Sequence, residues 1–336
     1  MGTDISWALV GASTIAEEWM INAIRSQPDG VIRAIVSGDL ARARQFADKH
    51  SIAIASVDLK EILADPQIDA IYISSTNEKH LPQVLAAAAA GKHVLCEKPL
   101  ALTTDDAREM IDACATHNVI LATNHHLRCA ATHQRMRDLI RGGSIGTPLF
   151  ARVFHAVSLP PHLRGWRIER PDAGGGVVLD ISVHDVDTLR FLLDAEPVEV
   201  SAMTTSGGMG KGGLADGVMG IIRFDNGVLA QIHDAFIVPF ARTGLEVHGS
   251  EGSLFGLDVM TQHPVGELML RSARGEEKIE VSHADLYVTA VAQFHRAVTM
   301  DQSPAASGRD GYLSLATALA LEKSAETSRH VIPPAV

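Results

Sequence analysis

Three short segments of the chain hold residues whose types and spacing suit cofactor binding or catalysis. The first, Gly11-Ala12-Ser13-Thr14-Ile15-Ala16, is close to the dinucleotide-binding fingerprint G-x-G-x-x-G/A. Gly11 permits a tight turn, Ala16 lets a helix pack closely on a strand, and the N-terminus of that helix can bind phosphate. Ser13 replaces the middle glycine, so it either holds the phosphate slightly away or donates its hydroxyl to it.

The second segment, Glu97-Lys98-Pro99, follows a predicted strand. Open α/β sheets place ligands at the carboxyl ends of their parallel strands, so Lys98 can reach a nicotinamide there. The alternative is an ordinary solvated lysine. Pro99 allows a cis peptide bond at modest cost, which would direct the Lys98 side chain inward.

The third segment is a glycine turn, Gly174-Gly175-Gly176, that continues into a predicted helix with Asp180 and His184. A spacing of four residues places the two side chains on one helix face. A metal would need a matched third ligand, and a structural histidine is a further alternative. An imidazole titrates near neutral pH, which suits a general acid.

The end of the second predicted strand separates NAD from NADP, because a carboxylate there binds the ribose 2′-hydroxyl but repels a 2′-phosphate. This position is Ser37, and Arg42 follows at the start of the next helix, where its guanidinium can pair with phosphate. NADPH is therefore the predicted cofactor. The alternative is a surface arginine, with Asp39 as the ribose ligand.

The fold must position these segments, and the order of predicted strands and helices changes once along the chain. Up to about residue 123, short apolar runs alternate with helix-period segments, which predicts βαβ units and an α/β NADP-binding Rossmann domain over residues 1–123. Residues 124–336 predict a substrate-binding α+β domain. It is expected to contain a helix to about Arg141, a Pro-, Arg- and Gly-rich loop after a strand at 148–157, and a helix at 177–193.

Alternating apolar and polar residues then predict strands at 198–205, 217–224, 228–236 and 245–248, with a hairpin turn at Asp225-Asn226-Gly227. Helices at 286–300 and 312–327 close this domain. The second domain is therefore expected to contain a largely antiparallel open sheet. Such a sheet could pair with another subunit or be solvated, so self-association stays open.

Composition excludes several classes of function. The chain has 336 residues, with 29 Lys and Arg against 40 Asp and Glu, and its formal net charge of −11 argues against nucleic-acid binding. Three cysteines without CxxC spacing favour a reducing compartment. We find no signal-peptide pattern and no membrane-spanning run, so a cytoplasmic protein is expected.

The GASTIA turn, Glu97-Lys98-Pro99 and the GGxxxDxxxH helix together resemble the Gfo/Idh/MocA oxidoreductase family, over essentially the whole chain. Within it, stretches such as STNEKH, HVLCEKPLA and DAGGGVVLDISVHDVDTLRF resemble NADPH-dependent reductases of a sugar-like ketone. The resemblance assigns catalysis to Lys98, Asp180 and His184. It favours NADPH at Ser37 and Arg42.

The resemblance also implies two sets of binding residues, and no metal is predicted because Asp180 and His184 lack a matched third ligand. Cofactor contacts are expected at Gly11, Ser13, Thr14, Ile15, Ser37, Arg42, Ser75, Thr76, Asn77, His80, Glu97 and Lys98. Substrate contacts are expected at Lys98, His155, Trp166, Arg167, Asp180 and His184.

In our mechanistic hypothesis, His184 donates the proton and Lys98 stabilises the carbonyl oxygen. Asp180 orients either His184 or Lys98. Which of Lys98 and His184 donates the proton is left open. Alternative functions are an NAD(P)-dependent inositol or sugar dehydrogenase, a non-catalytic NADP-binding sensor and, more remotely, a metal-dependent hydrolase.

Overall fold

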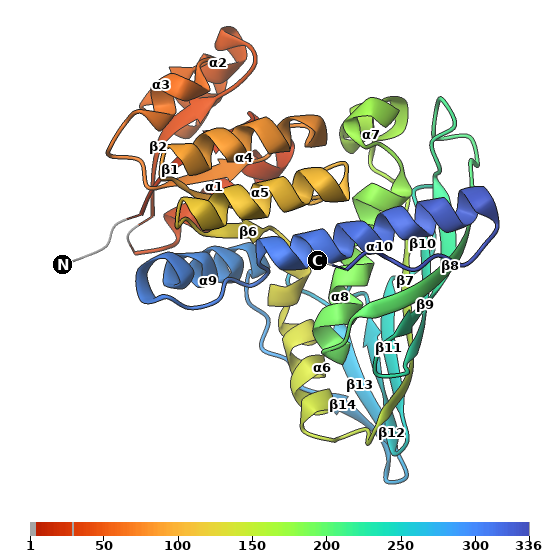
Figure 1. Cartoon of the computed structure of the whole chain (residues 1–336). Coiled ribbons are helices and arrows are strands. Elements are labelled where there is room, and N and C mark those ends of the chain that lie inside the picture. The colour runs from red at the N-terminus through yellow and green to blue at the C-terminus, as the bar shows by residue number, and fades with distance from the viewer. Residues whose placement is uncertain (1–4, 29, 336) are drawn as a thin grey trace. The chain divides into compact units, whose positions relative to one another are not determined.

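The computed structural model describes residues 5–28 and 30–335 (Figure 1). Contacts divide this part of the chain into two compact units. Unit 1 contains the residues up to His126 together with Tyr287–Tyr312, and unit 2 contains Leu127–Leu286 together with the residues from Leu313 onward. The predicted boundary after residue 123 would instead give all later residues to the second domain.

Unit 1 is built on a six-stranded sheet of order β3-β2-β1-β4-β5-β6. All neighbouring strands in it are parallel, which confirms the predicted Rossmann sheet. Its central strands are continuous apolar runs because both faces of a parallel sheet are covered. The strands are β1 (Ile5–Val10), β2 (Gly30–Val36), β3 (Ile54–Ser56), β4 (Ala70–Ile73), β5 (His93–Cys96) and β6 (Leu121–Thr123).

The helices of unit 1 follow the predicted pattern, with one addition. They are the π-helical turn η1 (Ala16–Met20), α1 (Ile21–Arg25), α2 (Leu40–His50), α3 (Leu59–Leu63), the 3₁₀ turn η2 (Asn77–Lys79), α4 (His80–Ala89) and α5 (Thr104–Thr116). The addition is α9 (Leu286–Met300), nearly all of which belongs to unit 1. The fully buried Trp7 of β1 lies 5.0 Å from the Phe294 ring and donates to His295 Nε2 at 3.1 Å. Helix α9 therefore completes the core of this unit.

Unit 2 contains an eight-stranded sheet of order β14-β13-β12-β11-β7-β10-β9-β8. Strands β7 and β10 are parallel, and the other neighbouring pairs among the described strands are antiparallel, which confirms the predicted sheet type. Strands β12 to β14 lie beyond those predicted. The strands are β7 (Pro148–Ala156), β8 (Pro197–Thr205), β9 (Gly217–Phe224), β10 (Leu229–Ala235), β11 (Gly244–Gly249), β12 (Gly252–Leu257), β13 (Glu267–Ser272) and β14 (Gly275–Ile279).

The predicted hairpin turn joins β9 to β10, with Gly227 at φ 87° and the Asn226 carboxamide accepting a hydrogen bond from Val228 N at 3.1 Å. Helices cover one face of the sheet. A Cβ on Gly220 of β9 would lie 2.9 Å from Leu321 Cδ2, so α10 packs directly on that strand. The covering helices are α6 (Ala131–Arg141), α8 (Val183–Leu193) and α10 (Gly308–Thr327).

The segment predicted as a Pro- and Gly-rich loop contains short helical turns, so that part of the prediction was wrong. These are η4 (Pro161–Leu163), α7 (Gly165–Glu169) and η5 (Pro171–Ala173), followed by the π-helical turn η6 (Val178–Ser182) that leads into α8. Proline is compatible with the first turn of a helix, which explains why proline-rich sequence here still forms short turns. The 3₁₀ turn η3 (His126–Cys129) precedes α6.

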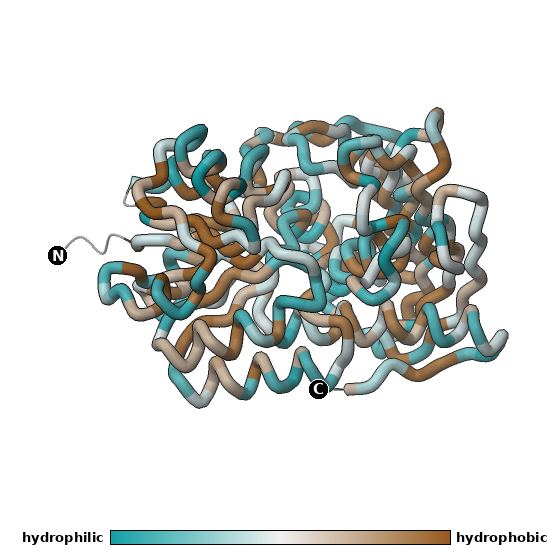
Figure 2. Tube along the Cα trace, turned by 90° about the horizontal axis from the view of Figure 1, so that it is seen from above, coloured by the Kyte–Doolittle hydropathy of each residue, from teal (hydrophilic) through white to brown (hydrophobic). Residues whose placement is uncertain are grey.

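Hydrophobic residues are concentrated in the interior of each unit, and hydrophilic residues are frequent on the exposed helices and loops (Figure 2). No helix in residues 5–28 and 30–335 is both long enough and apolar enough to cross a bilayer.

Candidate active site

The glycine turn after β1 passes in direct contact with the end of β4. Gly11 has φ +111°, and its N–H donates to Val36 O at 2.8 Å. A Cβ at this position would lie 2.8 Å from the Ser74 carbonyl carbon and 2.9 Å from Ser75 N. Only glycine fits this backbone conformation and this space.

Ser13 uses its hydroxyl inside the turn. Its Oγ donates to Ser74 Oγ at 2.7 Å and accepts the Ala16 N–H at 3.2 Å. A hydroxyl has one proton to donate. The Ser13 proton is therefore used within the turn, which disfavours the alternative in which Ser13 donates to a phosphate. Thr14 is exposed at the start of the helix.

Arg42 reaches back to the same turn. Its Nη2 donates to Ala12 O at 2.5 Å, whereas Asp39 accepts the Arg42 backbone N–H at 2.7 Å and caps α2. Capping occupies one oxygen of the Asp39 carboxylate. Ser37 is half-buried and directly follows strand β2, and its predicted contact with the ribose, like that of Arg42, stays a prediction.

The loop after β4 holds four predicted cofactor residues. Ser75 Oγ donates to Gln83 Oε1 at 2.7 Å, and Thr76 Oγ1 donates to Glu78 Oε1 at 2.8 Å. Asn77 is 4% exposed, and its Nδ2 has no hydrogen-bond partner among the residues the structure describes. A buried amide nitrogen in this state is a ready donor for a ligand.

His80 connects this loop to the loop after β5. The ring is fully buried, with Nε2 3.2 Å from Ser75 O and Nδ1 3.1 Å and 3.2 Å from the carbonyl oxygens of Pro99 and Leu100. Burial lowers the pKa of His80. We therefore see His80 hold two loops together, while its predicted contact with the cofactor stays a prediction.

Lys98 follows a buried polar cluster at the end of β5. Glu97 Oε1 accepts from Tyr72 Oη and from Asn124 Nδ2, each at 2.6 Å, and burial raises the pKa of the Glu97 carboxyl. The Lys98–Pro99 peptide bond is cis, as the sequence allowed. The half-buried Lys98 thus stands next to a carboxyl that two donors hold in place.

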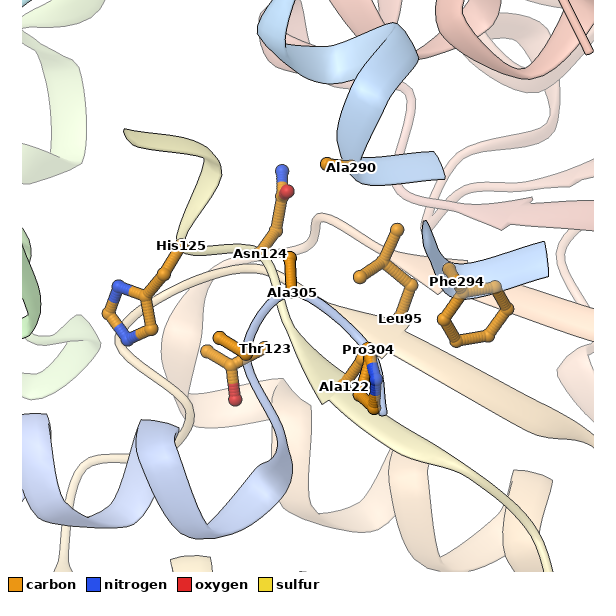
Figure 3. A pocket seen from close by; sticks show the side chains of 10 residues that line it. Leu95, Ala122, Thr123, Asn124, His125, Ala290, Phe294, Pro304 and Ala305 are labelled. Atoms are coloured by element: carbon orange, nitrogen blue, oxygen red, sulfur yellow. The ribbon is translucent and has the colours of Figure 1, made fainter. Parts of the chain in front are cut away.

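A small pocket lies beside this cluster, between the ends of β5 and β6 and helix α9 (Figure 3). Its lining is mostly apolar, with Leu95, Ala290 and Phe294 on one side and Asn124 at its rim. No charged side chain is among the ten residues that line it. We therefore do not assign the substrate to this pocket.

In unit 2, the glycine turn packs against helix α7. A Cβ on Gly175 would lie 2.9 Å from the carbonyl oxygens of both Trp166 and Arg167. The N–H of Gly176 donates to Arg167 O at 2.8 Å. The glycines therefore position the backbone of the two predicted substrate residues on α7.

Asp180 pairs with Arg167. Arg167 Nε donates to Asp180 Oδ1 at 3.1 Å, and its guanidinium lies 4.8 Å from the centre of the Trp166 ring. Asp180 lies in the π-helical turn η6, and His184, 8% exposed, lies in the first turn of α8. The junction between the π-helical turn and the α-helix lies between the two residues, and their shared face stays a prediction.

His155 contacts a carboxyl group that no motif in the sequence singles out. Its Nδ1 lies 2.9 Å from Oδ1 of Asp185, which is fully buried on α8. The neighbouring Asp234 of β10 is also fully buried. Asp185 immediately follows the predicted His184, but nothing in the spacing points to Asp234.

The predicted residues thus fall into two groups, one in each unit. Unit 1 brings together the cofactor set and Lys98, and unit 2 brings together Trp166, Arg167 and Asp180, with His155 and His184 on neighbouring elements. Tyr72 and Asn124 contact Glu97, Asp185 contacts His155, and Asp234 lies opposite His155, but neither motif nor spacing singled out these four residues. No group of three or more His, Cys, Asp or Glu within the described ranges could hold a metal ion.

Gly175→Ala is expected to loosen helix α7. The added methyl group must displace backbone carbonyls, at a strain cost of about 1–3 kcal/mol. Amide hydrogen exchange over residues 165–170 should therefore speed up about 5–160-fold. Gly244→Ala is the matched control, because its Cβ would meet nothing closer than 3.6 Å. Unchanged exchange in Gly175→Ala would show that the glycine is not needed to position α7.

Two family models match this chain. One is described as "Oxidoreductase family, NAD-binding Rossmann fold" and matches residues 5–125. The other is described as "GFO/IDH/MocA C-terminal domain" and matches residues 133–255. The two matches lie side by side along the sequence and together cover most of it.

Similar proteins give the same picture. A 1,5-anhydro-D-fructose reductase of Ensifer adhaerens is 55% identical over 96% of this chain and 97% of its own length. A myo-inositol 2-dehydrogenase of Thermotoga maritima is 30% identical over 90% of this chain and 91% of its own length. The crystal structure of an aldose-aldose oxidoreductase from Caulobacter crescentus, 23% identical, has a TM-score of 0.90 and covers 98% of this chain and 99% of that chain. At that identity it supports the fold alone.

Proposed function

Because this chain belongs to the Gfo/Idh/MocA family of oxidoreductases, we propose that it reduces the C2 ketone of 1,5-anhydro-D-fructose to 1,5-anhydro-D-mannitol with NADPH. The observation that carries the proposal is the 55% identity to the Ensifer adhaerens reductase over nearly the full length of both chains. With an odd number of cysteines, three, we place the enzyme in the reducing cytoplasm.

The residues of unit 1 fit a dinucleotide. The chain leaves β1 through a turn that admits no side chain at Gly11, and the exposed start of the following helix suits a phosphate. The buried Asn77 Nδ2, which has no donor role elsewhere in the described chain, suits a ligand acceptor. Ser37 and Arg42 support NADPH, because Arg42 offers positive charge and Ser37 offers no competing carboxylate.

Substitutions at Arg42 and at Ser37 should each shift cofactor preference from NADPH toward NADH, the first by removing a positive charge and the second by adding a negative one. Arg42→Ala should raise KM for NADPH about 10–100-fold, the value of one charge-assisted hydrogen bond, and leave KM for NADH nearly unchanged. Ser37→Asp should favour NADH, because its carboxylate repels a 2′-phosphate. Arg44→Ala, also exposed on α2, is the control. Equal effects of Arg42→Ala on both cofactors would contradict the assignment.

The reaction needs a hydride, a proton and stabilised negative charge at the carbonyl oxygen. Bound NADPH supplies the hydride. We assign the proton to His184 and the stabilisation of the oxygen to Lys98, since a positioned positive group acts on charge as it develops. Asp180 accepts a hydrogen bond from Arg167 and so positions the Arg167 side chain beside the proposed sugar site.

Trp166 and Arg167 suit a pyranose. The Trp166 indole offers an apolar face, and the Arg167 guanidinium stacks on it at 4.8 Å while donating to Asp180 and to Leu163 O. A flat aromatic surface bordered by fixed donors matches a ring with C–H groups on its faces and hydroxyls on its edge. This arrangement supports a sugar-like substrate.

The second candidate function is an inositol or sugar dehydrogenase that works in the oxidative direction, supported by the 30% identity to the Thermotoga maritima enzyme. Absorbance at the nicotinamide band separates the two. We expect rapid loss of NADPH with 1,5-anhydro-D-fructose, and no reduction of NAD or NADP with glucose, fructose or myo-inositol. Oxidation of inositol or glucose, with no turnover of anhydrofructose, would overturn the proposed substrate.

A further inference from the structure

Two buried carboxyl groups lie behind the predicted substrate residue His155. Asp185 comes from helix α8 and Asp234 from strand β10, and both are fully buried. Asp234 stands directly opposite His155 in the parallel pairing of β10 with β7, so the two side chains share one face of the sheet. His155 Nδ1 lies 2.9 Å from Asp185 Oδ1.

The two carboxyl groups lie close enough for a hydrogen bond between them and for each to affect the ionisation of the other. Two carboxyl groups can form such a bond only when one of them carries a proton. Asp185 Oδ2 and both oxygens of Asp234 have no N–H or O–H donor at normal geometry in the described chain, although the Ser182 hydroxyl lies close to Asp234. A hydrogen bond from one protonated carboxyl group to the other is thus the remaining way to give these buried oxygens a partner.

We propose that Asp185 and Asp234 share one proton and act as positioning residues that fix the tautomer of His155, with Nδ1–H donating to Asp185 and Nε2 as the acceptor toward the sugar. The substrate part of this inference rests on the proposed function. The tautomer part concerns unit 2 alone.

Electrostatics assign the proton within the pair. Burial, together with the neighbouring Asp185 charge, raises the pKa of Asp234 well above its usual range. Burial raises the pKa of Asp185 to about 7, and its hydrogen bond with Asp234 opposes that rise. Asp234 is therefore the protonated partner, and Asp185 is the carboxylate that accepts the His155 Nδ1–H above about pH 7.

We expect activity to fall on the low-pH side of the pH profile, called the acid limb below, and we assign this fall to the protonation of Asp185. From α6, the fully buried His133 faces His155, and burial lowers the pKa of His133 to about 3, so it stays neutral. From β7 and β10 come His155 and Asp234. On α8, the neighbouring Asp187 pairs with Arg128 at 2.7 Å, and His184 supplies the proposed proton. Activity should fall as pH drops through about 7, when Asp185 takes up a proton.

The test uses matched substitutions in the full-length enzyme. Asp234→Asn keeps a neutral hydrogen-bond donor, so we expect kcat/KM for anhydrofructose within about threefold of the native value and an unchanged acid limb. Asp234→Leu removes the donor at similar volume, so the acid limb should move to higher pH. Asp185→Asn replaces the carboxylate with a neutral carboxamide, which is a weaker acceptor and can present its NH2 to His155 instead, so kcat/KM should fall about 10–100-fold through KM for the sugar, with KM for NADPH unchanged.

A second measurement needs no substrate, so it separates this inference from the proposed function. In ¹⁵N-histidine spectra, the His155 signals, assigned by their loss in His155→Gln, should show a protonated Nδ1 and an unprotonated Nε2 at pH 8. Asp185→Asn should change this pattern, and Asp234→Asn should preserve it. Unchanged His155 signals in Asp185→Asn would overturn the inference, as would equal losses of activity in Asp185→Asn and Asp234→Asn.

If Asp185→Asn fails to fold, the native enzyme and Asp234→Asn still decide the matter. The native His155 spectrum should then titrate in step with the acid limb near pH 7. A tautomer with the proton on Nε2 would overturn the inference.

Discussion

His184→Ala and Lys98→Ala are each expected to lower kcat for anhydrofructose reduction by about 10²–10⁴-fold, the usual effect of losing a positioned acid or charge-stabilising group. NADPH binding should be largely retained, because neither substitution touches the glycine turn after β1. Stopped-flow measurement of NADPH oxidation gives kcat, and fluorescence titration gives NADPH affinity.

The pH profile distinguishes the two roles. A proton donor must be protonated to act, so activity that depends on His184 should be lost as pH rises above its pKa, and His184→Ala should lack this basic limb. Lys98→Ala should keep the limb at a lower rate. Lys60→Ala and His330→Ala, both exposed, are the controls. Full activity in either His184→Ala or Lys98→Ala would refute the catalytic assignment.

Gly11→Ala should be the most damaging single methyl group in unit 1. It combines a backbone conformation that L residues rarely adopt, φ +111°, with a 2.8 Å approach to the Ser74 carbonyl carbon. The combined cost is about 2–4 kcal/mol. If the turn distorts to relieve it, NADPH affinity should fall at least about 30-fold at the same free energy. Isothermal titration and thermal unfolding measure the two effects.

Gly38→Ala is the control for that experiment. Gly38 follows the predicted NADPH residue Ser37, yet an added Cβ would meet nothing within 4 Å. Its substitution should leave unfolding nearly unchanged. Native NADPH affinity and native stability in Gly11→Ala would mean that the turn is not the phosphate site.

Periodicity predicted most of the architecture, and it failed where burial or pattern gave no signal. The first sheet was predictable because its strands are short apolar runs between amphipathic helices. Strand β14, Gly275–Ile279, is mainly exposed and polar, so no alternation marks it. Helix α9 was predicted as a helix, but the spacing of its apolar residues does not indicate which sheet it covers. Its contact with Trp7 shows that it belongs to unit 1.

The candidate site was predictable where local motifs carry it. The tight turn at Gly11 and the hairpin at Gly227 follow from the residue types at those positions, and Pro99 permits the cis bond that precedes it. Other residues near the candidate site are far from these motifs in the sequence. Asp234 lies 49 positions after Asp185, and only the pairing of β10 with β7 brings it to His155. The links that His80 makes to Pro99 and Leu100 likewise depend on the fold.

Helix α9 also has a consequence for synthesis on the ribosome. Proteins of several domains often fold from the N-terminus as each domain emerges. Here the chain returns to unit 1 at Tyr287–Tyr312, so Trp7 stays uncovered by Phe294 until most of unit 2 has been made. At about 5–20 residues per second, that interval lasts on the order of 10–40 s. During it, the nascent dinucleotide-binding half presents an apolar surface that chaperones are suited to cover.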